Sequence, residues 1–123
     1  MENCLFCKIA KKQIPSTIVY EDEDVMAFKD IHPHAPVHLL VIPKIHLSTL
    51  SDCNAGHAPL LGKMLALAPR LAEEAGCAVT YDEDGAPGRG YRTVINSGPD
   101  GRQEIYHLHL HVIGGPHPWR NEQ

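Results

Sequence analysis

Short apolar runs, each bounded by polar residues or proline, recur along the chain and predict β-strands. The predicted strands are residues 17–20, 25–28, 38–42, 91–96 and 105–113. Four acidic residues separate the first two strands, so we expect a hairpin with an acidic turn there. The third strand lies between Pro36 and Pro43, positions at which a strand can begin or end.

One longer segment has the spacing of an amphipathic helix. From residue 58 to residue 75 the apolar side chains recur at intervals of three and four positions. They are Leu60, Leu61, Met64, Leu65, Leu67, Leu71 and Ala75. Pro59 suits the first turn of this helix and Gly76 its C-terminal end. Pro69 cannot donate a backbone hydrogen bond, so we expect a kink or an early break there.

Few helices and short turns among these strands favour an α+β fold over a βαβ arrangement. We predict an antiparallel sheet of about five strands with one long and one short helix, the short one at residues 8–13. Residues 82–90, which are rich in glycine and acid, are expected to form a loop. No repeat or linker interrupts the 123 residues, so 1–123 is expected to be a single domain.

Composition and charge narrow the classes of function. Hydrophobic residues make up 43% and charged residues 21%, which argues against intrinsic disorder. A formal charge of −4 without a basic run argues against a nucleic-acid partner. No apolar stretch approaches the roughly 20 residues that span a bilayer, so no membrane association is expected. The first residues lack an export signal, so we expect a cytoplasmic location, where the four cysteines are free thiols or metal ligands.

Histidine is the unusual residue of this composition, with nine copies against two Phe and one Trp. Three of them alternate with apolar residues in the segment 107–113, HLHLHVI. On a strand this places the three imidazoles on one face and directs the leucines and valine into the core. A buried imidazole without a partner costs about 1 to 3 kcal/mol, so three on one face indicate chemistry. Metal ligation and nucleophilic or acid/base catalysis both remain open from this pattern.

The segment 107–113 resembles the signature of the histidine triad (HIT) superfamily, in which histidines alternate with hydrophobic residues. Further blocks of the chain resemble the Hint branch, the histidine triad nucleotide-binding proteins. These blocks are residues 4–9, 14–15, 20–23, 27–31, 35–36, 38–44, 90–92 and 114–115. The resemblance covers residue 4 to residue 115 and implies a HIT-like fold.

The resemblance also implies a homodimer that binds purine nucleotides such as AMP or GMP. It implies hydrolysis of phosphoramidates through a nucleotide bonded to the middle histidine, His109. A neutral imidazole can attack phosphorus because its unperturbed pKa of about 6.5 leaves a lone pair free near pH 7. By the same resemblance, a backbone carbonyl beside His107 holds the other ring nitrogen of His109. His111 would lie beside the phosphate oxygens, and His38 on a neighbouring strand would complete the catalytic group.

The nucleotide-binding residues come from the resemblance as well. They would be Asp30, Asn96, Gly101, Gln103 and Glu104, together with the base-pocket residues Leu5, Phe6, Ile9, Phe28, Ile31 and Leu40. Asn96 would offer its amide and the turn 101–104 its backbone N–H groups to the phosphate, while Asp30 would accept from the ribose hydroxyls. Without the resemblance, Asn96 and the residues that follow it are typical of a turn, and Asp30 is a turn or N-cap acid. The apolar residues could equally belong to the core.

Two positions depart from the family pattern. Glu104 stands where some Hint proteins have a small hydroxyl residue, and its carboxylate would repel phosphate unless it were protonated or turned away. Pro116 replaces an expected arginine, and the tail at residues 118–123 lacks a familiar ending. The tail's contribution to leaving-group specificity therefore stays open, although Trp119 could still reach the site of the partner subunit.

Cys4 and Cys7 have a spacing that can hold one metal ion, and a redox pair, chance or two buried free thiols are the alternatives. Only three residues precede Cys4, whereas a thioredoxin-like pair would follow a strand. Zinc-bearing relatives supply two further ligands, which correspond here to His46 and His107. The resemblance thus implies a structural Cys2His2 zinc site beside the active site.

We therefore expect a purine nucleoside phosphoramidate hydrolase that requires no catalytic metal. One alternative is a dinucleoside polyphosphate hydrolase or nucleotidyltransferase of another HIT branch. Others are a nucleotide-binding module without turnover, and a metallohydrolase that uses the triad as metal ligands.

Overall fold

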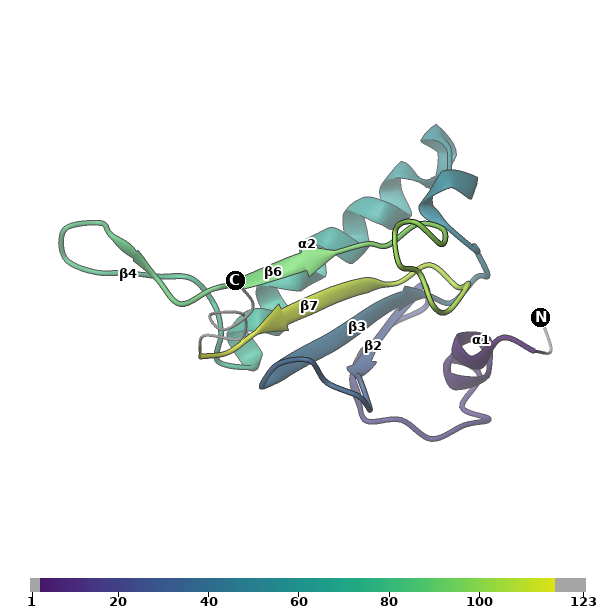
Figure 1. Cartoon of the computed structure of the whole chain (residues 1–123), viewed down its shortest axis with the longest axis horizontal. Coiled ribbons are helices and arrows are strands. Elements are labelled where there is room, and N and C mark those ends of the chain that lie inside the picture. The colour runs from purple at the N-terminus through teal and green to yellow at the C-terminus, as the bar shows by residue number, and fades with distance from the viewer. Residues whose placement is uncertain (1–2, 117–123) are drawn as a thin grey trace.

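Five strands form one antiparallel sheet in the computed structural model, which describes residues 3–116 (Figure 1). The strands are β1 (Ile18–Glu21), β2 (Val25–Lys29), β3 (Val37–Pro43), β6 (Tyr91–Val94) and β7 (Leu110–Gly114). Their order across the sheet is β1-β2-β3-β7-β6, and every neighbouring pair is antiparallel. The predicted α+β class with a sheet of five strands is therefore confirmed.

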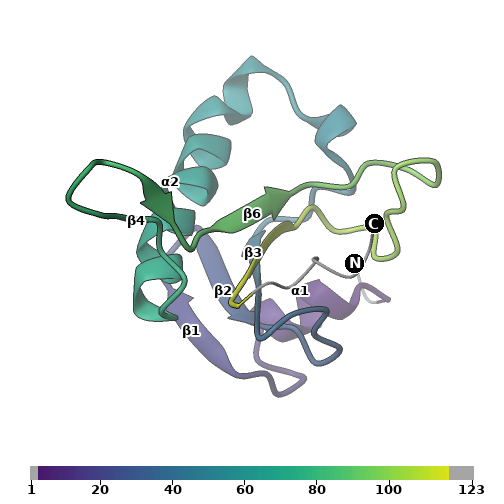
Figure 2. The ribbon, with the colours of Figure 1, turned by 60° about the vertical axis from the view of Figure 1, so that its left-hand side comes forward.

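The two helices lie on opposite faces of this sheet, α1 (Leu5–Ala10) on one and α2 (Ala58–Glu74) on the other (Figure 2). Under α2 the sheet contributes six residues of the main core, namely Val25, Ala27, Leu39, Val41, Leu110 and Val112, and Leu108 joins them from the segment before β7. The apolar half of the histidine segment therefore enters the core as predicted. Under α1, Phe6 and Ile9 pack on the opposite face of β2 and β3. Both middle strands are consequently buried on both faces.

Helix α2 spans residues 58 to 74 as predicted, but it does not break at Pro69. Pro69 is exposed, while Ala68 and Leu71 beside it are buried against the sheet. This packing keeps the helix continuous although Pro69 cannot donate its backbone hydrogen bond. Leu65, which we expected in the apolar stripe, is instead 51% exposed. Two short 3-10 turns, η1 (Leu50–Asp52) and η2 (Ala55–His57), precede the helix.

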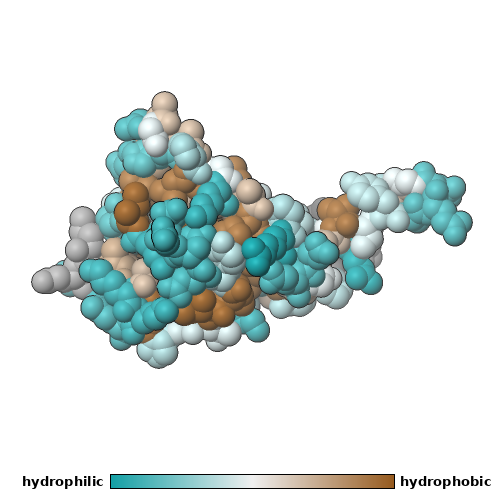
Figure 3. Space-filling model, turned by 180° about the vertical axis from the view of Figure 1, so that it is seen from behind, coloured by the Kyte–Doolittle hydropathy of each residue, from teal (hydrophilic) through white to brown (hydrophobic). Residues whose placement is uncertain are grey.

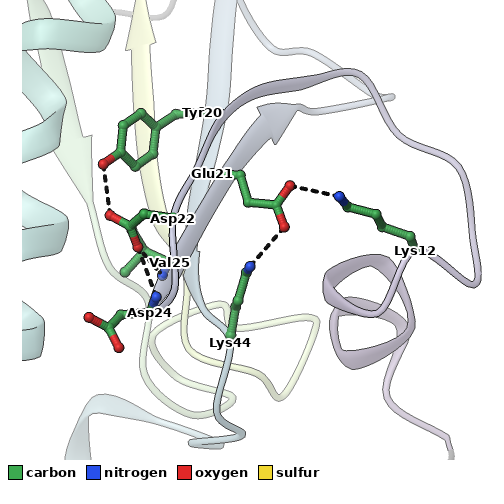
Figure 4. A network of polar contacts seen from close by, with 7 residues as sticks. All are labelled: Lys12, Tyr20, Glu21, Asp22, Asp24, Val25 and Lys44. Carbon is green, nitrogen blue, oxygen red and sulfur yellow. Dashed lines mark hydrogen bonds and ion pairs between the residues drawn. The ribbon is translucent and has the colours of Figure 1, made fainter.

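The turn between β1 and β2 is acidic, as expected, and it is organised by Asp22 (Figure 4). The backbone N–H groups of Asp24 and Val25 both donate to Asp22 Oδ1, and the Tyr20 hydroxyl donates to its Oδ2. Burial opposes the charged form, yet these bonds and the ammonium of Lys63 together hold the pKa of Asp22 well below its usual range. The hairpin thus keeps a charged carboxylate at its tip.

A second contact in Figure 4 connects the segment after α1 to the sheet. Glu21 at the end of β1 accepts from Lys12 at 3.0 Å and from Lys44 at 2.7 Å. Such exposed ion pairs add about 0 to 1 kcal/mol each. Their consequence here is positional, because they hold the end of α1 beside the strands that it covers.

Three other predictions differ from the structure. The short helix begins at Leu5 rather than residue 8, because the Cys4 thiol caps it by accepting from the Cys7 N–H. The expected loop at 82–90 is part of a small hairpin, in which β5 (Pro87–Gly88) pairs with β4 (Thr80–Tyr81) just before the loop. It extends away from the sheet, and its far end is hydrophilic (Figures 1 and 3). The histidine strand begins at 110 and not at 105.

The last difference has a clear cause. The Leu108 N–H donates to the carbonyl of Leu47, which lies after β3, at 2.6 Å. The chain before residue 110 is thus bonded to a loop instead of to a strand of the sheet, and residues 105–107 form bends. Within residues 3–116, no helix has the length and apolarity that a membrane crossing requires.

Candidate active site

A cavity of about 560 Å³ lies on the α1 face of the sheet, and the strand register determines which side chains enter it. Phe28 pairs with Leu40, Leu40 with His111, and His111 with Val94, so these four side chains form a row across β2, β3, β7 and β6. All four line the cavity. The row runs from an apolar end beside α1, past an imidazole, to the edge strand β6.

His109 is buried in the wall of this cavity, with one ring nitrogen fixed. Its Nδ1 lies 2.8 Å from the backbone carbonyl of His107, and a carbonyl can only accept, so the proton is on Nδ1. The Nε2 lone pair is therefore free. Burial lowers the pKa of His109, although the hydrogen bond to the His107 carbonyl opposes this shift. His109 is consequently neutral near pH 7 and has the form that a nucleophile needs.

A chain of hydrogen bonds fixes His111 in the complementary form. The backbone N–H of His34 donates to His38 Nδ1 at 3.0 Å, so the proton of neutral His38 is on Nε2. That N–H donates to His111 Nδ1 at 2.9 Å, which places the proton of His111 on Nε2. Burial lowers the pKa of His111 to about 4, so this ring is also neutral near pH 7. The ring centroids of His109 and His111 are 4.9 Å apart, so a lone pair and an N–H donor lie side by side.

Asp30 follows β2 at the rim of the cavity and has two contacts. Its Oδ1 accepts from the His32 N–H at 2.9 Å, and its Oδ2 lies 3.4 Å from His38 Nε2. Asp30 therefore fits both interpretations from the sequence, a turn acid and a residue of the candidate nucleotide site, because it also lines the cavity.

The apolar end of the cavity is a pocket between α1 and the sheet. The expected base-pocket residues all line it, namely Leu5, Phe6, Ile9, Phe28, Ile31 and Leu40. Phe6 packs edge-on against Phe28 at 5.5 Å and against His109 at 5.1 Å. Ile31 is 78% exposed and lies at the rim. Ile14 and Ile105 also line the cavity, although we did not predict them.

The turn after β6 provides fewer free donors than predicted. The Arg102 N–H donates to the carbonyl of Pro99 and the Gln103 N–H to that of Gly98, so two of the expected phosphate donors are used within the turn. Asn96 lines the cavity, and its amide already donates to the Gly101 carbonyl at 2.7 Å, which leaves one N–H.

Gln103 is a brace for this turn. Its buried amide donates to the carbonyls of Ser48 and Ile105 and accepts from the Gly98 N–H. Neither Gln103 nor Gly101 lines the cavity, which corrects the expectation that both face the phosphate. Glu104 does line it, and this carboxylate is exposed to solvent.

Behind the cavity wall, four predicted metal ligands converge. The ligand atoms of Cys4, Cys7, His46 and His107 all lie within 4.8 Å of one another. His107 Nδ1 is 3.3 Å from Cys4 Sγ and 3.4 Å from Cys7 Sγ. His46 Nδ1 is 3.3 Å from Cys7 Sγ.

The donor chemistry of this cluster suits a tetrahedral ion. His107 Nε2 donates to the carbonyl of Pro43 at 2.8 Å, so its Nδ1 lone pair is directed at the two thiols. His46 is arranged similarly, because its Nε2 lies 3.1 Å from Ser48 Oγ. Two thiolates and two imidazoles, each imidazole with a partner on its far nitrogen, are a donor set typical of structural zinc.

The comparisons with known proteins agree with this geometry. A family model described as scavenger mRNA decapping enzyme C-term binding matches residues 3–123. The purine nucleoside phosphoramidase of Escherichia coli (strain K12) is 45% identical over 114 residues, 93% of this chain and 88% of the relative. The 14 kDa zinc-binding protein of Zea mays is 48% identical over 113 residues, 90% and 80% of the two chains.

A solved structure shows the same likeness. The HIT family hydrolase from Legionella pneumophila Philadelphia 1 matches with a TM-score of 0.82 and 47% identity, over 93% of this chain and 94% of that one. The chain belongs to the histidine triad superfamily, in its Hint branch.

In this histidine triad protein the three signature histidines occupy two different sites. The rings of His109 and His111 line the cavity, whereas the ring of His107 is 0% exposed and belongs to the Cys2His2 cluster. The backbone carbonyl of His107, by contrast, contacts the His109 ring. Among the described residues, neither group of candidate metal-ligand atoms contains His109, so the rings do not converge as three ligands of one ion.

Several cavity residues were missed in the sequence. His34 contributes through its backbone N–H, and Arg92 lines the cavity from β6, one row beyond Val94. The two-residue spacing from Asn96 through Val94 to Arg92 is the signal that could have located Arg92. Trp119 and the rest of the 118–123 tail of this histidine triad protein lie outside the described residues.

Proposed function

We propose that this protein hydrolyses purine nucleoside phosphoramidates through a nucleotide covalently bonded to His109. The observation that carries the proposal is the fixed proton arrangement of the two cavity imidazoles. His109 presents a lone pair on Nε2, and His111 presents an N–H beside it. The name of the Escherichia coli relative, purine nucleoside phosphoramidase, supports the choice of substrate.

The cavity supports a substrate orientation. The purine would occupy the apolar pocket formed by α1, β2 and β3, and the ribose hydroxyls would donate to Asp30. The phosphate would then lie between His109 and the donors on His111 and Asn96. These donors are neutral and already oriented, so they need no rearrangement when negative charge grows on the phosphate oxygens.

The reaction has two displacements. His109 Nε2 bonds to phosphorus while the phosphorus–nitrogen bond of the substrate breaks, and the departing amine keeps that electron pair and takes a proton from water. Water then attacks phosphorus, the bond to Nε2 breaks, and the imidazole regains its lone pair. A side chain supplies the nucleophile, so no catalytic metal is required.

An acid-quenched single turnover with an adenosine phosphoramidate tests this directly. Intact-protein mass spectrometry should detect one added adenylyl group in the wild type and none in His109→Gly. His57→Gly, which removes a partly buried histidine that does not line the cavity, should retain the adduct. Turnover without an adduct, or an adduct on His109→Gly, would overturn the covalent route.

Two other functions remain distinguishable by kinetics. A dinucleoside polyphosphate hydrolase or nucleotidyltransferase would give a higher kcat/KM for diadenosine polyphosphate than for the phosphoramidate. A binding module without turnover would bind AMP and release no amine.

We also propose that Cys4, Cys7, His46 and His107 hold a structural zinc ion. When bound, the ion would cross-link α1 to the segment before β7 without an open position for catalysis. The name of the Zea mays relative supports this assignment. Metal analysis of protein purified without added zinc tests this assignment. The absence of zinc from the purified chain would contradict it.

We further propose a single domain, 1–123, that acts as a homodimer in the cytoplasm. The strand β6 lies at the edge of the sheet, where a second copy could pair with it. Sedimentation velocity would show a monomer if this is wrong.

A further inference from the structure

Arg102 has a backbone conformation that favours glycine. Its φ is 62°, in the left-handed region, although it carries a full side chain. The turn cannot relax this conformation easily, since the Arg102 N–H donates to the Pro99 carbonyl and the next N–H donates to Gly98. An arginine at this position therefore costs stability that a glycine would not.

Within the described residues, no ion pair of the Arg102 side chain compensates for this strain. The Arg102 side chain is exposed, and within residues 3–116 its guanidinium takes part in none of the ion pairs. It does line the catalytic cavity, together with Asn96 and Glu104. A strained residue that has no structural partner and faces a reaction site is a candidate for ligand recognition.

The position of Arg102 in the cavity indicates which part of a substrate it meets. The apolar pocket lies at the α1 end, the imidazoles of His109 and His111 lie in the middle, and β6 with the following turn forms the other end. A nucleoside in the apolar pocket leaves only this second end for the group that departs from phosphorus. The leaving group would therefore lie beside Arg102.

The charge at this end comes from three residues of the cavity wall. Arg92 and Arg102 are cationic, and Glu104 is the one carboxylate that lines this end among the described residues. Glu104 disfavours an anion, so recognition of one depends on the arginines. A guanidinium binds a carboxylate through two parallel N–H donors, a geometry that lysine cannot supply.

We propose that Arg102 is a specificity-determining residue that binds a carboxylate on the leaving amine. The preferred substrates are then purine nucleoside phosphoramidates of amino acids or similar acidic amines. This inference rests on the proposed function, because it assumes that the amine departs from a phosphorus atom held at His109.

Two matched substrates test it, adenosine 5′-phosphoramidates of alanine and of alaninamide, which differ in a carboxylate against a neutral amide. The measured quantity is the ratio of kcat/KM for the acid to kcat/KM for the amide. Arg102→Gly should lower this ratio roughly tenfold, as loss of one partly exposed charged hydrogen bond predicts, while kcat/KM for the amide stays within about twofold. Arg102→Lys should restore only part of the ratio.

Arg89→Gly is the matched control. Arg89 is also an exposed arginine with a left-handed backbone, φ 56°, but it follows β5 and does not line the cavity. It should leave the ratio unchanged, and thermal denaturation should show both glycine variants folded. Diadenosine polyphosphate adds a third arm, because its anionic leaving group is a phosphate and not a carboxylate.

The outcomes separate the two proposals. If the wild type releases amine from neither phosphoramidate, the proposed function fails. If it cleaves both but Arg102→Gly leaves the ratio unchanged, lowers both rates equally, or affects only diadenosine polyphosphate, the role of Arg102 in carboxylate recognition is overturned. An equal fall of the ratio in Arg89→Gly would overturn it as well.

Discussion

Acid should destabilise this protein through His111. Burial, with the neighbouring imidazoles of His109 and His38, lowers the pKa of His111 to about 4. A histidine in an unfolded chain has a pKa of about 6.5, so below that pH the unfolded state binds more protons than the native state. The contribution of this ring to stability is therefore complete above about pH 6.5 and is lost as the pH falls towards 4.

The size of the effect follows from the two pKa values. A native pKa of about 4 against an unfolded value of about 6.5 corresponds to a loss of about 2 kcal/mol at pH 5 and about 3 kcal/mol at pH 4. Against a total stability of about 5 to 15 kcal/mol, such a loss is large enough to measure in a urea titration.

The assay compares the free energy of unfolding at pH 7 and pH 5 in the wild type and in His111→Asn. Asparagine does not titrate, and its carbonyl can still accept from His38, so the variant should lose about 2 kcal/mol less than the wild type on acidification. His57→Asn, which removes a partly buried histidine that does not line the cavity, should retain the wild-type loss. Equal losses in wild type and His111→Asn would refute the conclusion that His111 is a neutral donor in the native state.

Three further outcomes are expected. His109→Gly should abolish amine release while calorimetry still detects AMP binding, because the donors of His111 and Asn96 remain. Leu108→Ala should lower the free energy of unfolding by about 2 to 5 kcal/mol in urea, because this side chain is buried in the core under α2. If the proposed zinc ion is bound, a metal chelator should lower the melting temperature of the purified protein, with the released ion measured by elemental analysis, because Cys4 and Cys7 would lose their cross-link to His107.

The strict alternation of the segment 107–113 was sufficient to predict which side chains enter the core, and the structure confirms this for Leu108 and Leu110. It was not sufficient to predict where the strand begins. A period of two describes extended backbone, whereas a strand also needs a partner, and Leu108 bonds to a loop carbonyl at Leu47 instead. The continuation of α2 through Pro69 has a similar explanation, because tertiary packing outweighs a local preference.

The site was predictable to the extent that residue types define chemistry. Cys4, Cys7, His46 and His107 converge as the family resemblance implied. The proton positions on the His38 and His109 rings could not be predicted from the sequence. They depend on a backbone N–H at His34 and a carbonyl at His107 that no sequence pattern marks. The strained backbone of Arg102 could not be predicted either, because only the folded turn shows its φ angle.

His107 contributes to two sites with two different parts of one residue. Its imidazole faces the thiols of Cys4 and Cys7, and its carbonyl orients the His109 ring. Every amino acid has a carbonyl, so replacing the side chain deletes a proposed zinc ligand without deleting the backbone contact to His109. If loss of that ligand disrupts the cluster beside the cavity, an alanine scan that scored only product formation would count His107 among the reacting groups, although its ring does not line the cavity.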